Sequence, residues 1–212
     1  SPHLLGVVSE KDLFSLQQIS LNDVSDVMHR ARDINQLIQA NNGVDQLARN
    51  MIGQGIAAEQ ITQFISILHD LLFERALIIA KKMHMDSLSE EVKALRYAIL
   101  GLGAHGRFEN TLYPQQQHLI IVKSISKLSN DVIRAEIVPV LKTWTGILEQ
   151  CGFRTENALL SYEMAYCLTL EEWQASLQNL FTNEVNIEDK SQNDKIGETI
   201  QQFCQILDAR FI

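Results

Sequence analysis

Hydrophobic positions in the first half of the chain recur every three or four residues, the spacing of one face of an α-helix. Residues Asn22–Ala40 are predicted to form such a helix, which should end at the turn-forming triplet Asn41-Asn42-Gly43. A shorter helix is predicted over Val44–Ile52 and a long one over Ala57–Met83. The long helix is apolar all round at residues 76–80, so we expect that stretch to pack on more than one side.

These helices predict a small antiparallel bundle that packs within one chain. The same apolar spacing fits a coiled-coil interface between two copies, so a homodimer stays open as an alternative. Ahead of the bundle, residues 4–9 predict a short buried strand, followed by a helix that Ser9 would cap. One strand and one helix cannot bury a core alone, so we expect their packing partners outside this sequence.

After Ser87 the pattern changes to short apolar runs separated by turns. Residues 95–103 predict a buried strand that enters a glycine-rich turn, and His118–Val122 predicts a second strand. Residues 203–212 predict a closing strand, whereas the polar, acidic residues 184–195 predict a surface loop. The second half is therefore expected to contain a small mixed sheet.

Two further helices are predicted in the second half. One covers Asn130–Gln150, with a kink or interruption at Pro139, because proline lacks the N–H that an inner helical residue donates. The other covers Leu170–Phe181, and Thr169 is its predicted N-cap. Trp144 and Trp173 fall on apolar helix faces and are expected in the core.

Charge and composition exclude several classes of function. The chain has 18 basic and 26 acidic residues, hence a net charge of −8, and its longest basic cluster is Lys81-Lys82. Such a charge repels nucleic acids and anionic lipid surfaces, so neither is an expected partner. No apolar run reaches the roughly 18 residues of a membrane-spanning helix. The three widely spaced cysteines are expected to be reduced, buried thiols of a cytoplasmic protein.

The segment most informative about chemistry is Gly101–Val122, with the sequence GLGAHGRFENTLYPQQQHLIIV. Glycines at 101, 103 and 106 follow a predicted strand, so backbone N–H groups could approach a phosphate closely. The segment has neither the lysine of a P-loop nor the helix start of a dinucleotide fingerprint.

This segment resembles the signature of the bacterial nucleotidyltransferases that follow paired CBS domains, a family related to the PII-protein uridylyltransferase. That signature reads G-S-x-G-R-x-E-x-x-L-x-x-D-Q-D and is followed by an apolar strand. Besides the strand, the matching positions are Gly103, Gly106, Arg107, Glu109, Leu112 and Gln116. The resemblance extends over residues 20–185, and residues 6–12 resemble the end of a CBS domain.

The resemblance implies an α+β fold: an N-terminal helical bundle followed by a nucleotidyltransferase-like domain with a small mixed sheet. The implied divisions are a CBS remnant at residues 1–18, a helical domain at 19–87 and the nucleotidyltransferase-like domain at 88–212. The family's reaction uses a nucleoside triphosphate and Mg²⁺, which two carboxylates hold against the phosphates. The implied nucleotide-binding residues are Gly103, Ala104, Gly106, Arg107 and Glu109.

Three departures fall on the atoms that this chemistry needs. The signature serine is Ala104, and the two metal-binding aspartates are Gln115 and Gln117. A neutral amide oxygen is a poor substitute for a carboxylate at a Mg²⁺ site. Asp208 on the closing strand could supply a third carboxylate, but one carboxylate cannot readily hold two metal ions. We therefore expect no intact metal site and no ordinary metal-dependent transfer.

The leading hypothesis is a signalling pseudoenzyme of this family, which senses a nucleotide or adjoining CBS domains and passes its state to a protein partner. The first alternative is an active nucleotidyltransferase whose metal ligands include Glu109, Asp208 and a histidine. A helical dimerisation scaffold without a ligand is the second alternative. Arg107 and Glu109 could equally form a structural salt bridge, and His105 and His118 could be core residues or metal ligands.

Overall fold

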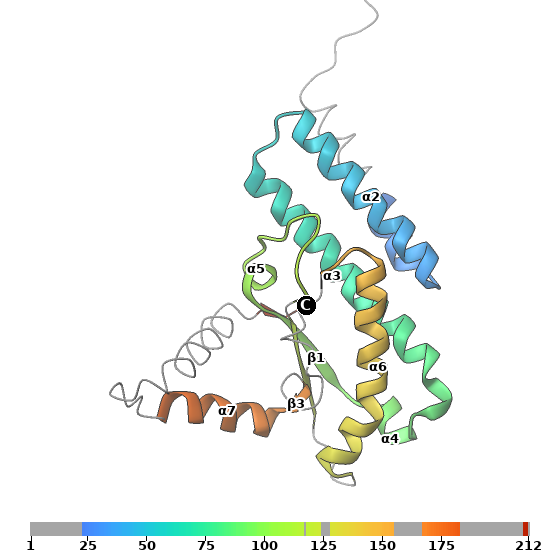
Figure 1. Cartoon of the computed structure of the whole chain (residues 1–212), viewed down its shortest axis with the longest axis vertical. Helices are drawn as coiled ribbons and strands as arrows, with labels where there is room; N and C mark the ends of the chain where they lie inside the picture. The colour runs from blue at the N-terminus through green and yellow to red at the C-terminus, as the bar shows by residue number, and fades with distance from the viewer. Residues whose placement is uncertain (1–22, 117, 124–127, 155–166, 183–209, 212) are drawn as a thin grey trace, which may run out of the picture.

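In the computed structural model (Figure 1), the chain is described over residues 23–116, 118–123, 128–154, 167–182 and 210–211. Residues 23–30 are helical. The elements that follow are α2 (Ile34–Gly53), α3 (Ala58–Met83), the 3-10 turn η1 (Met85–Ser87), α4 (Glu90–Lys93), β1 (Tyr97–Gly101), α5 (Gly103–Gly106), β2 (His118–Val122), α6 (Asn130–Gln150), β3 (Cys167–Thr169), α7 (Leu170–Thr182) and β4 (Arg210–Phe211). The predicted α+β class is confirmed.

The four strands form one mixed sheet in the order β3-β2-β1-β4. β1 is antiparallel to both β2 and β4, whereas β2 and β3 are parallel. The apolar strands are covered on both faces. Ile99 and Ile120 belong to the main core with the helices, while Leu100 and Ile121 pack with Trp173 of α7 in a second cluster. This two-sided burial explains why the strands read as continuous apolar runs.

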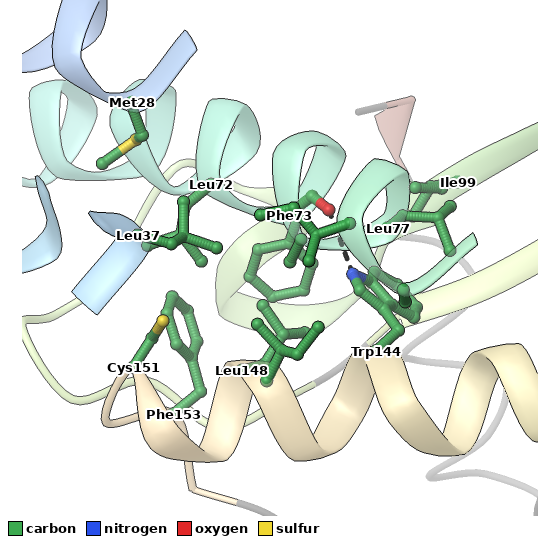
Figure 2. Packing of buried hydrophobic residues seen from close by; sticks show 14 of the residues in the cluster. Met28, Leu37, Leu72, Phe73, Leu77, Ile99, Trp144, Leu148, Cys151 and Phe153 are labelled. Carbon is green, nitrogen blue, oxygen red and sulfur yellow. Dashed lines mark hydrogen bonds between the residues drawn. The ribbon is translucent and has the colours of Figure 1, made fainter. Parts of the chain in front are cut away.

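The main core lies where α3 crosses α6 beside the sheet. Figure 2 shows Leu72, Phe73 and Leu77 of α3 facing Trp144 and Leu148 of α6. The indole Nε1 of Trp144 donates a hydrogen bond to the backbone oxygen of Phe73 at 3.0 Å, so its polar atom is paired inside the core. The prediction that Trp144 is a core residue is confirmed, and Trp173 is partly buried.

The predicted turn at Asn41-Asn42-Gly43 is wrong, because these residues lie inside α2. The chain breaks earlier instead, where the Asp33 side chain caps α2 by accepting a hydrogen bond from the N–H of Gln36. Tertiary contacts hold the triplet in the helix: Asn41 is buried and donates to the backbone oxygen of Cys151 at 2.7 Å. A Cβ on Gly43 would lie 3.3 Å from a Val24 methyl, so glycine permits a close helix approach.

The other helix predictions agree with the structure, with one correction. α3 and α7 occupy the predicted positions, and Thr169 caps α7 in a capping box: its hydroxyl accepts from the N–H of Glu172, whose carboxylate accepts from the N–H of Thr169. Of the kink or interruption predicted at Pro139, the interruption is wrong, because α6 continues through the proline, and the kink stays a prediction. Buried Ile133 and Leu148 on either side of the proline offset its cost.

Several sequence predictions lie outside the described residues. These are the CBS-like segment at 1–18, the loop at 184–195 and most of the closing strand, of which β4 is the described part. Within the described ranges, no helix combines the length and the apolar composition needed to cross a bilayer. The main core joins α2 and α3 to the sheet and α6. The domain division at residue 87 stays a prediction.

Candidate functional site

The glycine turn after β1 forms one helical turn, α5, with a positive φ at its first residue and another just beyond its end. Gly103, at its start, has φ 55°, a left-handed conformation that glycine adopts without steric cost. Phe108, just beyond it, has φ 60°, which costs free energy in a residue with a bulky side chain. The N–H of Glu109 donates to the Ala104 oxygen at 2.9 Å and closes the turn.

Two polar contacts anchor this turn on α3. The ring Nε2 of buried His105 lies 2.8 Å from a carboxylate oxygen of Asp70, and the N–H of Asn110 donates to the Ser66 hydroxyl at 3.2 Å. Sequence analysis missed Ser66 and Asp70 as parts of the site. The available signal was a pair of polar residues one turn apart on a largely apolar helix.

Arg107 and Glu109 form an ion pair on the surface of the turn. The Arg107 Nε lies 2.8 Å from a Glu109 oxygen, and the side chains are 45% and 57% exposed. The salt bridge that sequence analysis weighed against a phosphate contact is therefore present. Exposed pairs of this kind contribute at most about 1 kcal/mol, so the pair does not account for the turn's stability.

The signature loop is attached to the segment that follows α6. Gln115 pairs with Arg154 in a parallel β-bridge; the N–H of Arg154 donates to Pro114, and that of Gln116 donates to Arg154, both at 2.9 Å. The buried Gln116 side chain also donates to the backbone oxygen of Thr145 in α6 at 3.3 Å. Gln116, central in the signature, is thus a positioning residue between the loop and the helix.

Strand register places three residues next to predicted site positions at one end of the sheet. Gly101 at the end of β1 pairs with His118 at the start of β2 and with Arg210 at the start of β4. In sequence, Gln117 directly precedes His118, and Asp208 stands two residues before Arg210. Both lie outside the described residues, so their places in the site stay predictions.

Three imidazoles lie near the turn: His69 and His105 are buried, and His118 is half-buried. The rings of His105 and His118 pack against Phe73, with centroids 4.7 Å and 5.5 Å away, and His118 also lies 4.3 Å from Trp144. Burial, with a smaller contribution from His105, lowers the pKa of His69 and of His118 to about 3. Asp70 offsets part of the shift at His69. Both rings are therefore uncharged at neutral pH.

Two more predictions concern metal ligands and thiols. Among the described residues, no group of three or more His, Cys, Asp or Glu side chains could hold a metal ion.

Burial raises the pKa of the Cys151 thiol to about 12, which makes it unreactive and confirms the prediction of a buried thiol there. Cys167 lies in β3, and Cys204 is outside the described residues.

A glycine turn after the first strand, a glutamine-rich loop and a second apolar strand thus form one end of a small mixed sheet. Residues 42–186, more than half of the chain, match the family described as putative nucleotidyltransferase DUF294, and the chain belongs to that family. The match includes α5, the signature loop and β2. No curated protein matches the chain. The expected nucleotidyltransferase family is confirmed, while the CBS linkage and the relation to the uridylyltransferase remain predictions.

Proposed function

We propose that this chain is a signalling module of the nucleotidyltransferase family whose own transfer chemistry is degraded. The observation that carries the proposal is the replacement of both signature aspartates, by Gln115 and Gln117, together with the loss of the signature serine at Ala104. The scaffold around these positions remains, in the glycine turn and in the backbone pairing of Gln115 with Arg154. The changes therefore affect the chemistry more than the fold.

The residues of the site do not fit the Mg²⁺ that the family implies. Mg²⁺ favours charged oxygen ligands in near-octahedral geometry, and an amide oxygen carries no net charge. The carboxylates close to the turn also have cationic or hydrogen-bonding partners: Glu109 pairs with Arg107, and Asp70 contacts His105. We therefore derive no reaction step through a metal ion at this site.

The contacts that remain suit a module that transmits a conformational state. The turn is fixed to α3 through Asp70, and the signature loop is fixed to α6 through Gln116. A shift of either helix would therefore move the turn or the loop. The proposed input is a nucleotide or adjoining CBS domains, and the proposed output is the surface offered to a protein partner.

Calorimetric titration with ATP and then with UTP, first in excess Mg²⁺ and again in EDTA, tests whether the chain binds a nucleotide. The proposal predicts either binding that is equal in both buffers or no binding. Binding that requires Mg²⁺ would contradict it, because a metal-dependent pocket would then survive despite Gln115 and Gln117.

A restoring variant tests the degraded chemistry directly. Ala104→Ser with Gln115→Asp and Gln117→Asp should create Mg²⁺-dependent nucleotide transfer, measured as pyrophosphate release, where the wild type shows none. Gln39→Asp with Gln46→Asp is the matched control, because both are exposed glutamines of α2 and the charge change is the same. Turnover by the wild type would overturn the proposal.

A further inference from the structure

A groove of about 510 Å³ opens between the start of α2, the last turns of α3 and the end of α6. α3 packs on both of the other helices (Figure 1). The volume of the groove is within the range of roughly 300–1,000 Å³ that is usual for small-molecule sites. Its charged lining residues are Arg32, Asp33 and Lys82, and Ile34 and Ile79 are among the apolar ones. We call this cavity the three-helix groove.

Two of the three charged residues in the groove are cations without a partner. Arg32 and Lys82 are exposed, and neither side chain has an ion pair or a hydrogen bond with another described residue. The third, Asp33, accepts a hydrogen bond from the N–H of Gln36 at 2.9 Å and thereby caps α2. The groove is thus locally basic on a chain whose net charge is −8, and both cations would attract an anion that enters it.

Hydrogen bonds hold the α2 wall of the groove in place. Arg75 of α3 donates from Nε to the backbone oxygen of Ala31, which fixes the chain beside α3 just before Arg32. The N–H of Arg32 donates to the side chain of Gln36 at 2.8 Å. The backbone that carries the Arg32 side chain is therefore positioned before a ligand arrives, so binding has to order the side chain alone.

Apolar side chains lie next to the cations. Ile79 is buried, and Ile34 is partly buried against the main core. Ile79 and Lys82 are three residues apart on α3 and therefore lie on one face of that helix. A ligand whose negative group contacts Lys82 can thus place an apolar part on Ile79. The groove suits an organic anion better than a bare inorganic ion.

The glycine turn offers less to an anion than the three-helix groove does. The N–H groups of residues 106–109 donate to the backbone oxygens of residues 102–105. The arginine of the turn, Arg107, is paired with Glu109. These donors are thus already in use, whereas the cations of the groove are not.

We propose that the three-helix groove binds a nucleotide, with its phosphates against Arg32 and Lys82 and its base against Ile79. This inference deepens the proposed function and rests on it for the choice of a nucleotide, since the groove itself requires an organic anion. The signature turn is fixed to α3 and the signature loop to α6, and both helices line the groove. A nucleotide bound there would therefore act on the two helices that hold the signature segment.

Calorimetric titration of the full chain with ATP in EDTA, at 0.15 M salt, tests the site. The wild type should bind one ATP, and Arg32→Ala with Lys82→Ala should weaken binding about tenfold or more, because two charged contacts to phosphate are lost. Arg49→Ala with Lys142→Ala is the matched control: both are exposed residues of α2 and α6 outside the groove, and the same charge is removed. This control should bind ATP like the wild type.

A second pair of variants tests the groove without changing its charge. Asn35 is an exposed lining residue, so Asn35→Trp should fill the groove and block ATP. Asn42→Trp, at an exposed position of α2 two turns further along and outside the groove, should leave ATP binding unchanged. Circular dichroism verifies that each variant is folded.

The possible failures of this inference and of the proposed function can be told apart. ATP binding that survives either groove variant, or that is lost equally in the control variants, would overturn the groove as the site and leave the proposed function with a nucleotide bound elsewhere. A wild type that binds no ATP would also overturn the inference, and adjoining CBS domains would remain as the proposed input. Turnover of ATP by the wild type would instead contradict the proposed function.

Discussion

His69 and His118 are imidazoles that the fold keeps uncharged in its interior. Their pKa values are lowered from 6.5 to about 3, chiefly by burial. In the unfolded chain both rings take up a proton below pH 6.5, so the unfolded state binds more protons between pH 6.5 and pH 3. Stability is therefore fully present above pH 6.5 and is lost progressively as the pH falls through that window.

For His69, which is nearly inaccessible to solvent, this linkage predicts a loss of about 2 kcal/mol in the free energy of unfolding between pH 7.5 and pH 5. His69→Phe removes the titrating group, so the slope of the free energy of unfolding against pH should fall by the equivalent of about one bound proton. This holds whatever effect the substitution has on stability at pH 7.5. Urea denaturation at both pH values measures the slope. Gln39→Asn at an exposed position of α2 is a control, since it neither adds nor removes a titrating group and should leave the slope unchanged. An unchanged slope in His69→Phe would contradict the prediction.

At the level of single residues, the sequence predicted the turn but not the side chains that hold it. Gly103 and Arg107 belong to a readable signature. Asp70, however, meets His105 across 35 positions of sequence, and no local pattern predicts such a contact. Cys151 could be assigned to the interior because an unpaired thiol usually packs as a small apolar group.

Helices and strands were also predicted best from local pattern. The spacing of apolar residues predicted correctly the elements whose surroundings are the same along their whole length. α3 and β2 were predicted closely for that reason. α2 was divided wrongly because Asn41 and Gly43 read as a turn when taken alone. Their roles depend on distant partners, the Cys151 oxygen and the Val24 side chain. Local turn preference is weaker than a buried hydrogen bond and a close helix contact.

An apolar pocket of about 40 Å³ lies between α3, α4, the sheet and α6, and Val140 is among its lining residues. Residual cavity volume costs roughly 24 cal/mol per Å³, so a methyl group placed in the pocket should stabilise the protein by up to about 1 kcal/mol. We expect this gain from Val140→Ile, measured by urea denaturation. Val132→Ile on the exposed side of α6 is the matched control and should change stability little. A destabilised Val140→Ile would show that the pocket cannot accept the group.

At the scale of the whole molecule, the main hydrophobic core of the described residues extends from Met28 to Phe153 and includes residues of α2, α3, the sheet and α6. Phe73 lies at its centre. Its ring contacts the rings of His105, Trp144 and Phe153, with centroids 4.7 Å, 5.7 Å and 5.0 Å away. The helical first half therefore supplies one wall of the core on which the sheet depends. We expect the described helices and the sheet to unfold together.

Urea denaturation followed by two signals tests this cooperativity. Far-UV circular dichroism reports mainly on the helices, whereas tryptophan fluorescence reports on Trp144 in α6 and Trp173 in α7. The two midpoints should coincide in the wild type. Phe73→Ala should lower the free energy of unfolding by about 3–5 kcal/mol and shift both midpoints equally. Ile52→Ala, at an exposed position of α2, should change it by less than about 0.5 kcal/mol. If the two midpoints separate in the wild type, the chain instead contains independent folding units, as a division at residue 87 would require.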